Sequence, residues 1–243
     1  MLFHARKNQT SYGEAIGILL LDSGAPFIQG DVGNATTYDF PVRFKRIDGL
    51  TVTRILAHDQ SFVEKMIEGA CELEREGVMA ITGDCGFMAI YQNEVKQAVG
   101  IPVLLSSLLQ IPFIKSTIPN GTKVGILTAN SKALTAEVFE QIGIASDDSL
   151  VISGLENYKN FREAALDETG TLDSDKIRAE VVEAAQELIS RNQGIRSILL
   201  ECSMLPPYAA DVQKATNLPV YDFVTMINHA YSAIKTRHYA DTM

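Results

Sequence analysis

Residues 77–103 read GVMAITGDCGFMAIYQNEVKQAVGIPV, and residues 194–220 read GIRSILLECSMLPPYAADVQKATNLPV. Aligned end to end, the two stretches pair Cys85 with Cys202. Each has a short apolar run that ends in an acid and a cysteine, then a helical segment, and then a hydrophobic strand opened by Ile-Pro or Leu-Pro. The chain therefore contains an internal duplication that puts two thiols in equivalent places.

The rest of the chain alternates strand-like and helix-like segments. Strands or extended pieces are predicted at 15–21, 41–47, 50–56, 78–82, 123–128, 150–153, 195–201 and 220–221, and helices at 61–77, 87–99, 173–191, 206–215 and 224–238, with a further helix from Asn130. This alternation indicates parallel sheets with helices on both faces. We expect two lobes, residues 1–118 and 119–243, with a C-terminal helix that can cross over to the first.

The composition is that of a mildly acidic globular protein. Of 243 residues, 46% are hydrophobic and 21% are charged, with 21 Lys and Arg against 30 Asp and Glu and a formal net charge of -9. This length allows two lobes of roughly 110 to 120 residues, each able to bury a core. The negative charge weighs against nucleic acid or an anionic membrane as a partner, so we expect a small-molecule partner.

The N-terminal stretch and the cysteines bear on location and metal binding. The apolar run near the N-terminus has only about eight residues, too few to span a membrane, and no small-residue cleavage site follows it. Three cysteines fit a reducing compartment better than a disulfide scaffold, so we expect a cytoplasmic protein. Without a Cys-x-x-Cys or a histidine cluster, no metal site is predicted, and Cys71 is interpreted as a small buried hydrophobe.

Side chains that can carry chemistry fall where the predicted strands end. In an open parallel sheet, ligands bind beyond the carboxyl ends of the strands. If the lobes face each other about a pseudo-twofold axis, Cys85 and Cys202 lie on opposite sides of one cleft, which is the predicted active site. The residues at these strand ends are Asp22, Ser23, Asp84, Cys85, Asn130, Ser131, Glu201 and Cys202.

Each of these two cysteines comes just before a predicted helix. Free N–H groups and the helix dipole there stabilise a thiolate and lower its pKa, whereas a neighbouring carboxylate raises that pKa. The same N–H groups, with Gly86 and Ser203, can hold a substrate carboxylate without an arginine. Asp84 and Glu201 either exchange protons with the thiols or only fix the turns. The candidate catalytic residues are Cys85, Cys202, Asp84 and Glu201.

The doubled strand, cysteine and helix arrangement and the early Asp22-Ser23-Gly24 turn resemble the aspartate/glutamate/hydantoin racemase superfamily over nearly the whole chain. The resemblance implies two flavodoxin-like lobes and a reaction without pyridoxal phosphate or another cofactor. It implies that one cysteine removes the α-proton of the substrate as a thiolate, while the other protonates the opposite face. By the same resemblance, Asp22, Ser23, Asn130 and Ser131 contribute to the substrate pocket.

Two replacements separate this chain from glutamate racemases, which typically follow the first cysteine with Asn-Thr and the second with Thr-His. Here the residues are Gly86-Phe87 and Ser203-Met204, which weighs against free glutamate as the substrate. We therefore expect an isomerase, a cofactor-independent racemase or epimerase that acts on a small carboxylate such as an amino acid or a close derivative. From the general frequency of twofold oligomers, we expect a homodimer or a higher homo-oligomer.

Other functions fit the same pattern. In cis-trans isomerisation of an unsaturated diacid, one cysteine would add to the double bond. Decarboxylation is expected to need one cysteine, whereas this chain keeps two. A two-lobed binding module without turnover also fits the fold, and it would keep its affinity when either cysteine becomes serine. A thiol hydrolase is disfavoured because no histidine accompanies either cysteine in its turn.

Overall fold

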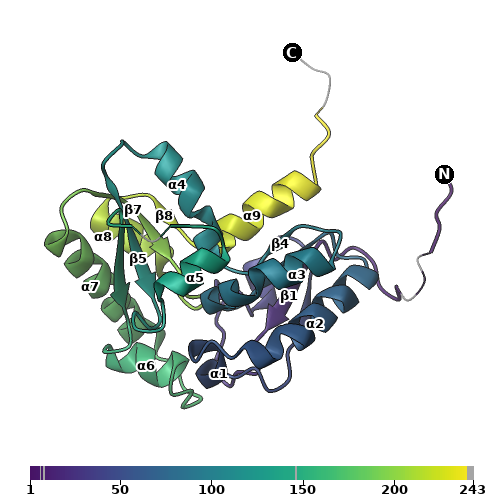
Figure 1. The fold of residues 1–243 in the computed structure, drawn as a ribbon, viewed down its shortest axis with the longest axis horizontal. Helices are drawn as coiled ribbons and strands as arrows, with labels where there is room; N and C mark the ends of the chain where they lie inside the picture. Colours follow the sequence, from purple (N-terminus) through teal and green to yellow (C-terminus); the bar gives the residue numbers. More distant parts are fainter. Residues whose placement is uncertain (6, 8, 146, 240–243) are drawn as a thin grey trace.

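The computed structural model describes residues 1–5, 7, 9–145 and 147–239. Its frame is two four-stranded parallel sheets, with the strand orders β2-β1-β3-β4 and β6-β5-β7-β8, and helices cover both sheets (Figure 1). This confirms the predicted α/β fold with two similar lobes. The strands are β1 (Ile16–Leu20), β2 (Val42–Arg46), β3 (Ala80–Gly83), β4 (Val103–Leu104), β5 (Lys123–Thr128), β6 (Leu150–Gly154), β7 (Ile195–Leu200) and β8 (Val220–Tyr221).

Helices connect the strands within each lobe. The α-helices are α1 (Val52–Leu56), α2 (Val63–Arg75), α3 (Gln92–Ala98), α4 (Ile111–Thr117), α5 (Ala136–Gln141), α6 (Lys159–Ala165), α7 (Ser174–Arg191), α8 (Ala209–Thr216) and α9 (Phe223–Ile234). Short 3₁₀ helices are η1 (Ala35–Thr37), η2 (Gln60–Phe62), η3 (Gly86–Tyr91), η4 (Ser107–Gln110) and η5 (Pro206–Tyr208). The predicted division after residue 118 falls between α4 and β5 and stays a prediction.

One segment predicted as extended, residues 50–56, forms α1 instead. The hydroxyl of Thr51 caps this helix by accepting the N–H of Arg54. Val52 and Ile55 lie three residues apart and are both buried, as expected for one face of a helix. Their β-branched side chains favour strands in isolation, but the burial of this shared face outweighs that preference.

The helices after the two cysteines also differ from the prediction. Both begin as 3₁₀ turns, η3 and η5, before α3 and α8 start. The helix predicted from Asn130 begins only at α5, because the Asn130 side chain accepts the N–H groups of Lys132 and Ala133 in a turn. The short helices α4 and α6 were not predicted.

The Gly-Ile-Leu sequence in the first strand of each lobe has a packing reason. A Cβ at Gly17 in β1 would lie 2.9 Å from a methyl carbon of Leu73 in α2, and a Cβ at Gly125 in β5 would lie 2.9 Å from a methyl carbon of Leu188 in α7. Both glycines therefore let a helix pack closely on its sheet. This packing fixes the central strands at whose ends the candidate site forms.

The last helix comes from the second half of the chain but packs on the first sheet. Phe223 and Ile227 of α9 share a buried cluster with Ile16 of β1, and the Tyr231 ring stacks on Phe40 with centroids 3.7 Å apart. In Figure 1, α9 (yellow) leaves the second lobe and runs beside the first. One face of the N-terminal sheet is thus covered by the C-terminal helix.

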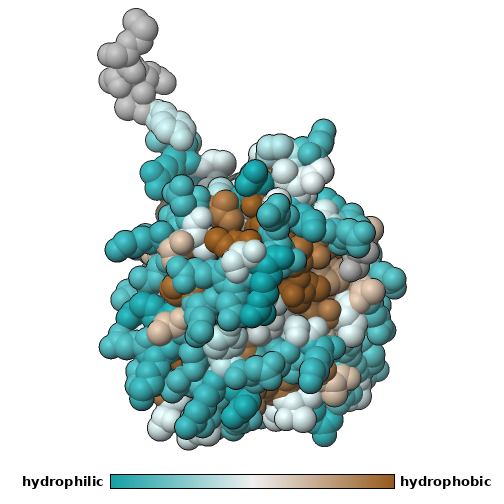
Figure 2. All heavy atoms as spheres, turned by 90° about the vertical axis from the view of Figure 1, so that its left-hand side faces the viewer, coloured by the Kyte–Doolittle hydropathy of each residue, from teal (hydrophilic) through white to brown (hydrophobic). Residues whose placement is uncertain are grey.

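In the part of the chain that the structure describes, no helix combines the length and the apolar content needed to cross a bilayer. Figure 2 shows the face that lies to the left in Figure 1, where α7 and α8 are found. This face is hydrophilic over most of its area, with smaller hydrophobic patches between the polar side chains. The long helix α7 accordingly buries one side, including Val181 and Leu188, and turns the other toward solvent.

Candidate active site

Cys85 and Cys202 occupy the same position in the two lobes. Cys85 lies just beyond β3, next to β1 in its sheet, and Cys202 lies just beyond β7, next to β5. The carbonyl of each cysteine accepts an N–H three residues later, from Met88 at 2.9 Å and from Leu205 at 3.1 Å. Each thiol therefore sits in a tight turn at the carboxyl edge of its sheet.

Both thiols line a single cavity between the lobes. Its volume is about 40 Å³, which leaves room for only a few small groups. Apart from two serines, one carboxyl and the two thiols, the wall is apolar, and it includes no Lys, Arg or His among the described residues. The lining residues are Leu21, Ser23, Phe27, Val52, Ile55, Leu56, Asp84, Cys85 and Phe87 from the first lobe and Ala129, Ala165, Leu166, Cys202, Ser203 and Met204 from the second.

The acid before each cysteine is buried and bonded within its own lobe. Asp84 accepts the N–H of Leu21, just beyond β1, at 2.9 Å. Glu201 accepts the hydroxyl of Thr128, at the end of β5, at 2.8 Å. Burial raises the pKa of both carboxyls to about 7, although these hydrogen bonds act in the opposite direction. The two acids therefore fix the turns and also titrate near neutral pH.

Burial raises the pKa of both thiols well above the usual range, and the nearby carboxylates raise it further. After burial, the carboxylate of Glu201 has the largest effect on each thiol. The N–H of Phe87 at Cys85 and the N–H of Met204 at Cys202 lower the pKa, as predicted for these turns, but they are outweighed. Without a ligand, the thiols are therefore protonated at neutral pH.

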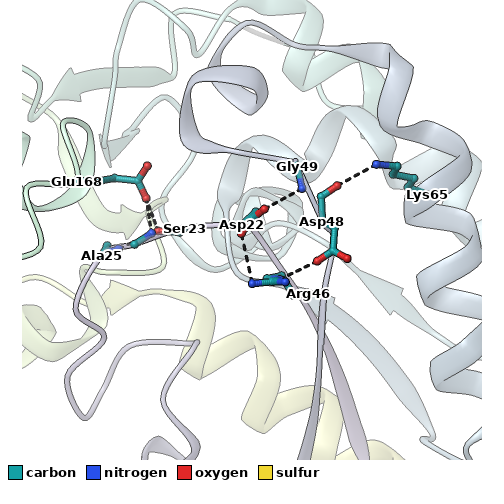
Figure 3. Close-up of polar contacts among 9 residues, drawn as sticks. Asp22, Ser23, Ala25, Arg46, Asp48, Gly49, Lys65 and Glu168 are labelled. Atoms are coloured by element: carbon teal, nitrogen blue, oxygen red, sulfur yellow. Dashed lines mark hydrogen bonds and ion pairs between the residues drawn. The ribbon is translucent and has the colours of Figure 1, made fainter.

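The first predicted strand-end pair, Asp22 and Ser23, diverges in the structure (Figure 3). Asp22 turns toward β2, where its carboxylate accepts the N–H of Gly49 at 2.9 Å and pairs with Arg46 at 3.6 Å, and it does not line the cavity. Ser23 does line the cavity. Its hydroxyl donates to Glu168, a residue of the second lobe, at 2.6 Å, and the N–H of Gly24 donates to the same oxygen at 2.8 Å.

The corresponding pair in the second lobe, Asn130 and Ser131, lies outside the cavity. The Asn130 side chain accepts backbone N–H groups within its own turn. Ser131 donates its hydroxyl to Glu156 at 2.5 Å and its N–H to the other oxygen of the same carboxylate at 3.1 Å. These two residues shape the loop after β5 and do not reach the thiols in this structure.

Of the two small residues expected to hold a substrate, Ser203 lines the cavity and Gly86 serves another purpose. A Cβ at Gly86 would overlap the carboxyl oxygen Oε1 of Glu201. The glycine is therefore required for the close approach of the second lobe to the Cys85 turn.

Two acidic residues near the cavity, Asp31 and Glu168, were not predicted from the sequence as site residues. Asp31 is 1% exposed, and its charge contributes to raising the pKa of the Cys202 thiol. Burial in turn raises the pKa of Asp31 itself. The glycine-rich loop around Asp31 packs on the second lobe, where Gly30 meets Pro207. The glycine-rich composition of this loop could have indicated Asp31 from the sequence. No feature of the neighbouring sequence indicated Glu168.

No set of three or more His, Cys, Asp or Glu side chains within the described ranges is arranged to hold a metal ion. The thiols, the carboxyls and the turn N–H groups can instead move a proton at a carbon atom and bind a small acid.

Comparison with known proteins places this arrangement in a family. The model of the Asp/Glu/Hydantoin racemase family matches residues 44–229. The chain belongs to the Asp/Glu/hydantoin racemase family. Solved structures agree with the fold: unliganded arylmalonate decarboxylase has a TM-score of 0.59 at 15% identity, covering 93% of this chain and 95% of that one. Glutamate racemase from Francisella tularensis in complex with D-glutamate has a TM-score of 0.56 at 17% identity, covering 95% of this chain and 85% of that one.

Relatives with higher identity carry a different activity in their names. A dimethylsulfoniopropionate lyase of Durusdinium sp. clade D is 33% identical over 217 residues, which cover 86% of this chain and 71% of that protein. Dimethylsulfoniopropionate lyase 3 of Emiliania huxleyi is 29% identical over 230 residues, which cover 90% of this chain and 60% of that protein. This member of the racemase family thus spans less than three quarters of the length of either relative.

Proposed function

We propose that this chain is a lyase that removes a proton from the carbon next to a carboxylate and expels a sulfide from the following carbon, with dimethylsulfoniopropionate as its substrate. A cysteine thiolate takes the proton, and the C–S bond breaks with its electron pair going to sulfur. The products are acrylate and neutral dimethyl sulfide. The observation that carries the proposal is the cavity between the lobes, which both Cys85 and Cys202 line and whose wall contains no basic side chain.

The wall of the cavity suits a substrate with a cationic, methylated end. Phe27 and Phe87 supply aromatic rings in the wall, which can hold a sulfonium, and a sulfonium nearby favours the ionised form of the buried acids Asp84, Glu201 and Asp31. The substrate carboxylate would take the N–H groups of the cysteine turns and the Ser203 hydroxyl. The second carboxylate of an acidic amino acid would find no basic side chain in this wall.

The positive charge of the substrate also affects the ionisation of the thiol that acts as the base. The thiols are protonated in the empty site because burial and carboxylates raise their pKa. A sulfonium in the cavity offsets the carboxylates and lowers the thiol pKa, so the base forms when the correct substrate is bound. The second thiol, still protonated across the cavity, donates a hydrogen bond to the developing enolate.

The test is release of dimethyl sulfide, measured by headspace gas chromatography, from the reduced protein with dimethylsulfoniopropionate. We expect release in the wild type and a loss of at least about 100-fold in Cys85→Ser and in Cys202→Ser, the usual range for removal of a general base. Cys71→Ser is the matched control, because Cys71 lies in α2 and does not line the cavity. Full activity in both cavity variants would overturn the proposal.

A second candidate is racemisation or epimerisation of an amino acid or a close derivative. The matched thiols from opposite lobes favour it, because inversion at carbon needs a base on one face and an acid on the other. Chiral chromatography of aspartate, glutamate and hydantoins after incubation with the protein distinguishes the two. A new enantiomer without dimethyl sulfide would support the racemase, and unchanged substrates together with tight binding would support a module without turnover.

A further inference from the structure

Glu201 has one satisfied and one unsatisfied carboxyl oxygen. Its side chain is fully buried. Oε2 accepts the Thr128 hydroxyl, whereas Oε1 is buried without a hydrogen-bond partner among the described residues. Leaving a buried carboxylate oxygen unpaired is costly, and protonation of that oxygen lowers the cost by removing the buried charge. The free oxygen is therefore the natural place for a proton.

The free oxygen also crosses the boundary between the lobes. Oε1 lies against Gly86, the residue after Cys85, so closely that a side chain there would overlap it. Glu201 is bonded through the backbone to Cys202. Ser107 donates its hydroxyl to the carbonyls of Leu200 and Glu201 at 3.1 and 3.3 Å, which fixes this position. One carboxyl thus adjoins the turns of both thiols.

Asp84 and Glu201 occupy matching positions in the duplication, but their side chains make different contacts. Its hydrogen bond is to Leu21 of its own lobe. The titratable groups that raise the pKa of Cys85 are Glu201, Asp84 and Cys202, and those that raise the pKa of Cys202 are Glu201, Asp31 and Asp84. The imidazole of His58 is held at the carbonyl of Ala133 at 2.8 Å and is not part of the cavity wall.

We propose that Glu201 is a positioning residue shared by both thiols, a buried carboxyl whose protonation controls how readily Cys85 and Cys202 each become a thiolate. When Glu201 is ionised, each thiolate must form beside a negative charge, and when Glu201 is protonated, each thiolate forms beside a neutral acid. The inference rests on the proposed role of the thiols as bases, but it concerns their ionisation and can be tested without a substrate.

The experiment is alkylation by iodoacetamide as a function of pH, with each cysteine followed separately by peptide mass spectrometry. Glu201→Gln keeps the size and the hydrogen bond of the side chain but cannot become negative. We expect the alkylation midpoints of Cys85 and Cys202 both to fall by about one pH unit or more, the size of shift that removal of a nearby charge produces, with about tenfold faster alkylation at pH 8.

Asp84→Asn is the matched control and should move both midpoints less than Glu201→Gln does. A shift at Cys202 alone in Glu201→Gln would overturn the sharing across the lobes, and unmoved midpoints, or an equal effect of Asp84→Asn, would overturn the role of Glu201. If Glu201→Gln does not fold, Thr128→Val serves instead. Loss of this hydroxyl keeps Glu201 protonated to higher pH, so both midpoints should fall by a smaller amount, and their rise would contradict the proposal.

These outcomes are separate from those of the lyase assay. Absence of dimethyl sulfide from the wild type would overturn the proposed substrate and leave the alkylation result standing. Unmoved alkylation midpoints in a protein that does release dimethyl sulfide would overturn the role of Glu201 alone.

Discussion

At Asp84 and Glu201, burial decides the charge of the site. Each carboxyl keeps a hydrogen bond to the end of a neighbouring strand, yet its pKa rises to about 7 because the ionised form is removed from water. The strength of this burial could not be predicted from the sequence, which shows only that an acid precedes each cysteine. A site with two such acids becomes more negative as the pH passes through neutrality.

This burial has a consequence for stability. The pKa of Glu201 is higher in the folded chain than in the unfolded one, so the folded state binds the proton more tightly, and the resulting stability is lost as the pH rises from about 4 through about 7. From pH 5 to pH 8, the free energy of unfolding of Glu201→Gln should therefore rise relative to the wild type by about 2 kcal/mol.

Urea denaturation of both proteins at pH 5 and pH 8 measures this difference. Burial also raises the pKa values of Asp31 and Asp222. Because both residues are present in the variant and in the wild type, their contributions to the free energy of unfolding cancel in the difference. A difference between variant and wild type that is the same at both pH values would show that Glu201 is ionised in the folded state throughout.

Among the elements, the loop after α6 closes the cavity on the side of Ser23. Glu168 adopts a left-handed backbone conformation, with φ of 48°, which is uncommon for a residue other than glycine. Its carboxylate holds the Ser23 hydroxyl and the Gly24 N–H of the opposite lobe. Ala165 and Leu166, just before this loop, line the cavity. The contact in Figure 3 therefore ties together two walls of the site.

Glu168→Ala removes this tie, and hydrogen exchange measures the effect. We expect faster exchange at Gly24 and Ala25, because the first loses its acceptor and the second is bonded to the Ser23 hydroxyl at 3.1 Å. Glu168→Gln retains an acceptor oxygen and should protect Gly24 better than Glu168→Ala does. Asp167→Ala, which alters only a partly exposed pair with Arg162, is the control and should leave this loop unchanged. Equal exchange in all variants would show that the loop is held by other contacts.

The alternation of apolar strand-like runs with helical segments was enough to predict the strands and their parallel sheets, because apolar runs followed by turns report burial directly. The duplication predicted that Cys85 and Cys202 occupy equivalent places. Contacts between lobes could not be predicted, since they join residues far apart in the sequence, as Ser23 and Glu168 are. The α1 helix was missed because the β-branched Val52 and Ile55 favour strands in isolation, whereas the contacts that bury this helix face, including those with η3, join residues far apart in the sequence.

At the scale of the whole molecule, α9 makes the first lobe depend on the second half of the chain. Phe223 is fully buried in the cluster that includes Ile16 and Ala80 of the first sheet. Phe223→Ala should lower the free energy of unfolding by about 3 kcal/mol, the usual cost of removing a buried phenylalanine. Hydrogen exchange should then rise in β1 and β3 more than in β5 and β7.

A matched change on the same helix is Ala233→Ser, at an exposed position, which should alter neither quantity. If Phe223→Ala instead raised exchange mainly in β5 and β7, the C-terminal helix would support its own lobe and the coupling would be absent.

The central claim is that both thiols act on a proton bound to carbon next to a carboxylate. The most direct measurement is proton NMR in heavy water of the reduced protein with dimethylsulfoniopropionate and a panel of amino acids, hydantoins and small diacids. With the sulfonium substrate, we predict loss of the C2 proton signal and new vinyl signals of acrylate in the wild type and in Cys71→Ser, and neither change in Cys85→Ser or Cys202→Ser. Undiminished turnover in both cavity variants, or no change at carbon with any member of the panel, would contradict the account.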